Sequence, residues 1–178
     1  MSEELRIVPY DQMWPLAFAK EANRIRDALD ALALRIDHNG STSVPGLAAK
    51  PIIDIQVSVK SLTPIEAYAQ PLKSIGYHHV PHADDSFCPF FYRPSDWPHT
   101  HHIHVVKAGG DEERRTLAFR DYLRDHFDEA RRYEQLKHEI AAHLAPNNDD
   151  AREAYARAKT EYVERILANA LKAGYPRE

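Results

Sequence analysis

Residues 34–59 read LRIDHNGSTSVPGLAAKPIIDIQVSV, and this stretch predicts two β-strands joined by a loop. The first strand is expected over 34–38 and the second over 51–59, while the loop between them is rich in glycine, serine and proline, which favour turns. In the second strand isoleucine and valine alternate with polar residues, among them Asp54 and Gln56. Side chains alternate across a strand, so we expect one face of it to join a core and the other to be free for chemistry.

Further helices and strands flank this unit. The patterns predict helices over about 11–33, 63–76, 112–125, 128–144 and 150–172, and strands over 77–81, 87–93 and 101–107. Strands dominate the first part of the chain and helices the last. The prediction is therefore an α+β fold with a mixed β-sheet packed by helices and a helical C-terminal part.

Three local features refine these elements. Thr63 to Glu66 matches a capping box at the start of a helix, and Asp128 is placed to cap another. The strands at 77–81 and 87–93 contain or adjoin proline, which cannot donate a hydrogen bond to a neighbouring strand. We therefore expect both of them at sheet edges.

Composition narrows the class of protein. The chain has 178 residues, of which 43% are hydrophobic and 28% charged, as expected for one ordinary domain spanning residues 1–178. A net charge of −4 argues against a broad basic surface for nucleic acid, and the single cysteine excludes an internal disulfide. No apolar leader follows Met1 and no run reaches membrane-spanning length. We expect a cytoplasmic protein with a small-molecule partner and no membrane partner.

The loop and the second strand suggest phosphate chemistry. Gly40 lets backbone N–H groups approach an anion, and the Ser41 hydroxyl can donate to a phosphate oxygen. Asp54 could hold a divalent cation that bridges the phosphates, with Mg²⁺ as the default ion. The alternatives are a tight turn without a ligand and a structural salt bridge from Asp54, for example to Lys50.

The strand at 101–107 adds imidazoles. His102 and His104 alternate with apolar residues and therefore share one face of the strand. If that face is the one that carries Asp54 and Gln56, the four side chains form a mixed nitrogen and oxygen set. Such a set suits Zn²⁺, Mn²⁺ or Fe²⁺ better than Mg²⁺, and a histidine could also act as a general base. The alternative is a solvated sheet edge.

Three segments resemble the GrpB family. They are HNGSTSVPGLAAKPIIDI at 38–55, HIHV at 102–105 and FRDYLR at 119–124. The resemblance covers nearly the whole chain, and the first motif is long enough to be specific. It implies a nucleotidyltransferase-like fold.

The motif of the nucleotidyltransferase superfamily is matched in part. That motif joins a Gly-Gly or Gly-Ser turn to an aspartate, a hydrophobic residue and a second carboxylate. Gly40, Ser41 and Asp54 match it, but Gln56 stands in place of the second metal-binding carboxylate. An amide adds no negative charge, so this departure argues against ordinary two-metal transfer.

Several other side chains could bind the phosphates of a nucleotide. The candidate nucleotide-binding residues are Gly40, Ser41, Thr42, Ser43, Lys50, Arg120 and Lys137. Arg120 or Arg124 could clamp a phosphate with its planar fork, or could instead brace the sheet. Lys137 and Lys159 could each bind a phosphate or belong to an ordinary helix surface.

Three functions are compatible with these residues. The leading one is a nucleotidyltransferase-like enzyme that binds a nucleotide or phosphorylated small molecule with a divalent metal, Mg²⁺ or Mn²⁺ first and Zn²⁺ as an alternative. Its catalytic residues would be Asp54, His102 and His104. The second is a non-catalytic ligand-binding or assembly module that retains the fold, as Gln56 suggests. The third is a metal-dependent hydrolase that uses the histidines.

Overall fold

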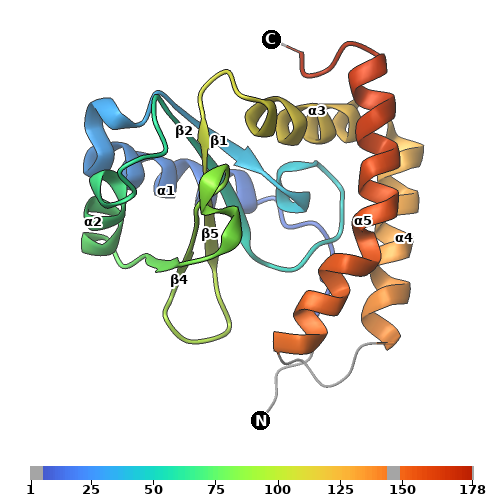
Figure 1. Cartoon of the computed structure of the whole chain (residues 1–178). Coiled ribbons are helices and arrows are strands. Elements are labelled where there is room, and N and C mark those ends of the chain that lie inside the picture. Colours follow the sequence, from blue (N-terminus) through green and yellow to red (C-terminus); the bar gives the residue numbers. More distant parts are fainter. Residues whose placement is uncertain (1–5, 144–148, 178) are drawn as a thin grey trace.

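A mixed β-sheet organises the protein, seen in a computed structural model that describes residues 6–143 and 149–177 (Figure 1). Its five strands, β1 to β5, lie in the order β1-β2-β5-β4-β3. The strands are β1 (Arg35–Asn39), β2 (Ile53–Val59), β3 (His78–Val80), β4 (Phe90–Arg93) and β5 (His101–Lys107). The pairing of β2 with β5 is parallel and the other three pairings are antiparallel. The α+β fold with a mixed sheet is confirmed.

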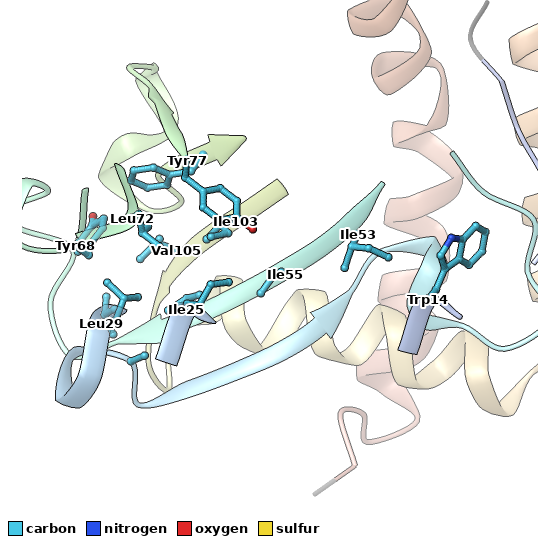
Figure 2. Close-up of a cluster of buried hydrophobic side chains, with 14 of the residues drawn as sticks. Trp14, Ile25, Leu29, Ile53, Ile55, Tyr68, Leu72, Tyr77, Ile103 and Val105 are labelled. Carbon is cyan, nitrogen blue, oxygen red and sulfur yellow. The ribbon is translucent and has the colours of Figure 1, made fainter. Parts of the chain in front are cut away.

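Two helices cover one face of the sheet. They are α1 (Trp14–Leu29), which continues into a short 3₁₀ turn at Asp30–Leu32, and α2 (Glu66–Ser74). Apolar side chains from both helices meet the isoleucines and valines of β2 and β5 in one core (Figure 2). Ile25 of α1, Leu72 of α2 and Ile55 of β2 are completely buried there. Fully burying one such side chain stabilises the fold by about 1.5–3 kcal/mol.

Three helices form the C-terminal part, as the sequence predicts (Figure 1). They are α3 (Asp111–Asp125), α4 (Phe127–His143) and α5 (Asp149–Lys172). A second apolar cluster joins them to the loop that follows β1, with Val44 and Leu47 from the loop packed near Tyr133 and Ile166. The end of the helix predicted over 128–144 and most of the link to the next predicted helix lie outside the described residues.

Two arginines attach α3 to β1 and to the turn that follows it. Arg120 donates from Nη1 to the backbone oxygen of His38 at 3.2 Å and pairs with Asp37 at 3.4 Å, while its Nε donates to Asp121 at 2.7 Å. Arg124 donates from Nε to the backbone oxygen of Ser43 at 3.0 Å. These bonds favour the bracing role for both arginines over a phosphate clamp.

Three local expectations are wrong. β4 lies inside the sheet, because its prolines at 89 and 94 flank the strand and leave its own N–H groups free to pair. The helix after Thr63 begins only at Glu66, too far along for Thr63 to cap it, and no side chain caps its start. α4 begins at Phe127, so Asp128 lies in its first turn.

None of the helices in the described part of the chain combines the length and the apolar character that crossing a bilayer requires.

We expect Arg120→Met to lower the free energy of unfolding by about 1.5–3 kcal/mol, because it removes the cation that Asp37 and Asp121 share. Each carboxylate keeps one other arginine, Arg35 for Asp37 and Arg124 for Asp121. Urea denaturation followed by circular dichroism measures this change. The control is Arg132→Met, which removes an exposed pair with Glu129 and should change stability by no more than about 1 kcal/mol. Equal stability of the Arg120→Met protein and the unmodified protein would contradict the bracing role.

Candidate functional site

The parallel pairing of β2 with β5 creates the candidate site. Asp54 lies opposite His102 in the register, and both residues point away from the apolar core. His104, two residues further along β5, shares that face. One ligand atom from each of the three side chains lies within 4.8 Å of the others. The sheet therefore brings together the carboxylate and the two imidazoles that the sequence suggests as metal ligands.

The side chains of this trio lie close enough for their charges to affect one another. His102 Nδ1 lies 3.4 Å from Asp54 Oδ1, and His104 Nε2 lies 3.7 Å from the same oxygen. Burial alone would raise the pKa of Asp54, but hydrogen bonds to the two histidines hold it below its usual value. Burial alone would lower the pKa of His104, but its bonds to Asp54 and Cys88 raise that pKa to about 10. A metal ligand must be deprotonated, so a proton and a metal compete for His104.

Other side chains contact the two imidazoles on the sides that do not face Asp54. His99 Nδ1 lies 3.1 Å from His102 Nε2, and Cys88 Sγ lies 3.9 Å from His104 Nδ1. The Phe90 ring contacts both imidazoles, with centroid distances of 4.9 and 5.1 Å. Contacts to the second ring nitrogen of a ligating histidine fix its orientation, so these residues support the trio. Sequence reasoning missed them, since only the pairing of β4 with β5 brings Phe90 opposite His104.

Gln56 does not join the trio. Its side chain is 0% exposed, and its Oε1 accepts a hydrogen bond from Asn39 Nδ2 at 3.2 Å and another from Thr116 Oγ1. These bonds tie β1, β2 and α3 together. The structure therefore gives Gln56 a structural role and leaves it out of the candidate metal ligands.

Gly40 makes room for the carboxylate of Asp54. Its backbone has φ +65°, and a Cβ atom built at this position would lie 2.3 Å from Asp54 Oδ2. The turn that follows is held internally: Ser43 Oγ donates to the Gly40 oxygen at 2.6 Å, and Thr42 Oγ1 lies 2.9 Å from His38 Nε2. Ser43 is thus committed to the turn, which argues against its expected contact with a nucleotide.

A pocket of about 520 Å³ opens beside the trio. It is lined by Asp54, His102 and His104 together with Ser41, Thr42, Ala49, Lys50, Ile52, Phe90, Trp97, Lys137, Tyr155, Ala156 and Lys159. We call it the phosphate pocket, after the ligand that the sequence leads us to expect there. Four expected nucleotide-binding residues line it, namely Ser41, Thr42, Lys50 and Lys137. Gly40, Ser43 and Arg120 do not.

Three lysines gather around the wall of the phosphate pocket. Lys50 Nζ lies 4.1 Å and Lys159 Nζ 4.5 Å from the centre of the Tyr155 ring. Lys137 is 2% exposed, donates to the backbone oxygen of Ala48 and lies 4.9 Å from the Tyr133 ring centre. Burial and the nearby charge of Lys159 lower the pKa of Lys137 to about 7, and burial also lowers the pKa of Lys159. An anion among them would relieve this crowding of positive charge.

We expect Gly40→Ala to destabilise the protein more than Gly46→Ala does. Both glycines have positive φ, so alanine strains the backbone by about 1–2 kcal/mol at either position. Only at Gly40 does the new methyl group also collide with Asp54, since nothing lies within 4 Å of a Cβ at Gly46. Overpacking adds about 1–3 kcal/mol.

Guanidinium denaturation of the two glycine variants in parallel measures the difference in the free energy of unfolding. Equal losses of stability in the two variants would show that glycine is needed at position 40 only for its backbone conformation, and not to make room for Asp54.

Comparisons with known proteins place these features in a family. The profile described as GrpB protein matches residues 4–169. A UPF0157 protein of Pseudomonas aeruginosa is 40% identical over 174 residues, which cover 96% of this chain and 69% of the relative.

Two solved structures resemble this protein in fold. The crystal structure of the conserved protein GrpB from Enterococcus faecalis aligns with TM-score 0.84 and 31% identity, covering 94% of this chain and 98% of that one. The Cid1 poly(U) polymerase aligns with TM-score 0.51 and 15% identity, covering 78% of this chain and 43% of that one. This second likeness concerns the fold, which is nucleotidyltransferase-like as expected. With its profile match and its structural likeness over almost the whole length, this chain belongs to the GrpB family.

Proposed function

We propose that this protein binds a nucleotide, or another phosphorylated small molecule, together with a divalent metal ion and transfers a nucleotidyl group. One observation carries the proposal. A single pocket has the trio Asp54, His102 and His104 on its wall and three lysines beside them. Metal ligands and cations around one cavity match the two needs of a polyphosphate, which are a bridging cation and partners for its remaining charge.

The donor set selects the metal. Two imidazoles and one carboxylate suit Mn²⁺ or Zn²⁺ better than Mg²⁺, which prefers oxygen ligands. Asp54, His102 and His104 would hold the ion, and the ion would polarise a phosphoryl oxygen as a Lewis acid. The contacts from His99 and Cys88 to the outer ring nitrogens keep both imidazoles turned towards Asp54.

The lysines would bind the phosphates. Lys50 and Lys159 face the same tyrosine ring from a loop and from α5, and Lys137 reaches the pocket from α4. Ser41 adds a hydroxyl donor on the same wall. Hydrogen bonds between a cation and a phosphate are about twice as strong as neutral ones.

Aromatic side chains offer a surface on which the nucleobase of a nucleotide could stack. Trp97 and Phe90 line the phosphate pocket, and Trp97 packs against His99 with 5.0 Å between ring centres. Stacking on an aromatic ring contributes about 1–3 kcal/mol for each base. The Cid1 structure is described as bound to Mg and 3′-dATP, which makes an adenine nucleotide with a metal the first ligand to test.

A metal-dependent hydrolase is the second candidate, and the two histidines of the trio are the observation that favours it, while Gln56 argues against transfer. The amide stands where a transferase of this fold needs a second carboxylate, and its oxygen is already engaged by Asn39 and Thr116. One metal held by two histidines and one carboxylate is a sufficient ligand set for activating water. A protein that binds the nucleotide and releases no product would instead be a ligand-binding module.

We expect ATP to bind the protein in the presence of Mn²⁺, with an affinity that falls by about tenfold or more in Lys159→Met. A hydrogen bond to a charged group contributes about 1.5–3 kcal/mol, and this variant removes one such donor. Asp54→Asn should abolish the dependence on Mn²⁺. Isothermal titration calorimetry measures both effects, with Lys60→Met, an exposed lysine at the end of β2, as the control.

The proposal fails if ATP does not bind with Mn²⁺, or if Asp54→Asn binds ATP and Mn²⁺ as the unmodified protein does. Chromatography of the incubated nucleotide separates the functions. Pyrophosphate released with a modified acceptor indicates transfer, free AMP or ADP without an acceptor indicates hydrolysis, and unchanged ATP indicates a binding module.

A further inference from the structure

A second pocket, of about 360 Å³, opens on the other side of the trio, between the sheet, α3 and α5. We call it the acidic pocket. Its charged lining residues besides Asp54 and His104 are Glu112 and Arg115 of α3 and Glu164 of α5. Asp54 and His104 therefore line both pockets, whereas His102 lines only the phosphate pocket.

The two pockets carry opposite charge. Leaving the trio aside, the charged residues that line the phosphate pocket are the three lysines. The acidic pocket carries Glu112 and Glu164 against one Arg115, which already pairs with Glu164 at 2.8 Å. The first turn of α3 is itself acidic, with Asp111 and Glu113 on either side of Glu112. A polyphosphate is thus favoured in the first pocket and repelled from the second.

Much of the remaining wall of the acidic pocket is apolar. Phe119 comes from α3, and Val163 and Leu167 come from adjacent turns of α5. Apolar walls with a few placed polar groups are typical of sites for small organic molecules. Its occupant should have an apolar body and either no charge or a positive one.

We propose that the acidic pocket binds the second substrate of the proposed transfer: a small apolar molecule that carries a hydroxyl group towards Asp54 and His104 and a basic nitrogen towards Glu112. This assignment rests on the proposed function. The hydroxyl oxygen forms a bond to the α-phosphorus, and the bond from that phosphorus to its bridging oxygen breaks. Pyrophosphate leaves with that electron pair, and the hydroxyl proton passes to water.

Three phenols of similar size test the charge preference. Tyramine carries an ammonium group, 4-ethylphenol carries no charge, and 3-(4-hydroxyphenyl)propionate carries a carboxylate on a comparable body. We expect tyramine to bind the full chain most tightly and the propionate least, in calorimetric titrations without nucleotide or metal. Glu112→Gln should lower the affinity for tyramine by about tenfold and leave the affinity for 4-ethylphenol unchanged. The control Glu161→Gln alters an exposed carboxylate of α5 outside the pocket and should change neither.

A Val163→Trp variant, which fills the acidic pocket from its half-buried wall, should abolish binding of tyramine and of 4-ethylphenol. Tighter binding of the propionate than of tyramine, or an unchanged tyramine affinity in Glu112→Gln, would overturn the inference. If ATP binds with Mn²⁺ and none of the phenols binds, the second-substrate site is wrong while the proposed function stands. If tyramine binds and ATP does not, the role in transfer is overturned.

Discussion

The parallel pairing of β2 with β5 is the constraint on which the rest of the structure depends. It sets Asp54 opposite His102 and puts His104 on the same face, while the alternate residues of both strands enter the core under α1 and α2. Slipping one strand by a single residue would turn its apolar side chains out and its polar ones in. Burial of the core face therefore fixes which face of the sheet the trio lies on, and contacts from His99, Cys88 and Phe90 then orient the two imidazoles.

The C-terminal helices serve the site as well as the fold. They bury apolar side chains against the loop after β1, and Arg120 joins α3 to the sheet through Asp37 and the His38 backbone. The same packing brings Lys137 of α4 and Lys159 of α5 to the wall of one pocket. The three lysines consequently lie on one side of the trio, while Glu112 and Glu164 lie on the other. This difference in charge separates the places of the two proposed substrates.

The alternation of side chains along a strand made the residues of the trio predictable from the sequence. The pattern around Asp54 and that around His102 and His104 each show which side chains share a face, although the pairing of the two strands had to be assumed. The role of Gln56 could not be foreseen, because Thr116, which engages it, comes from a helix 60 residues further along the chain. The meeting of the lysines around one ring likewise depends on how α4 and α5 pack.

Anomalous diffraction at the manganese edge, from crystals soaked in MnCl₂, shows whether the trio holds a metal ion. We expect an anomalous peak between the Asp54 carboxylate and the imidazoles of His102 and His104, and no such peak in crystals of Asp54→Asn. Manganese peaks only elsewhere on the protein, or a peak that persists at the same place in the variant, would contradict this expectation.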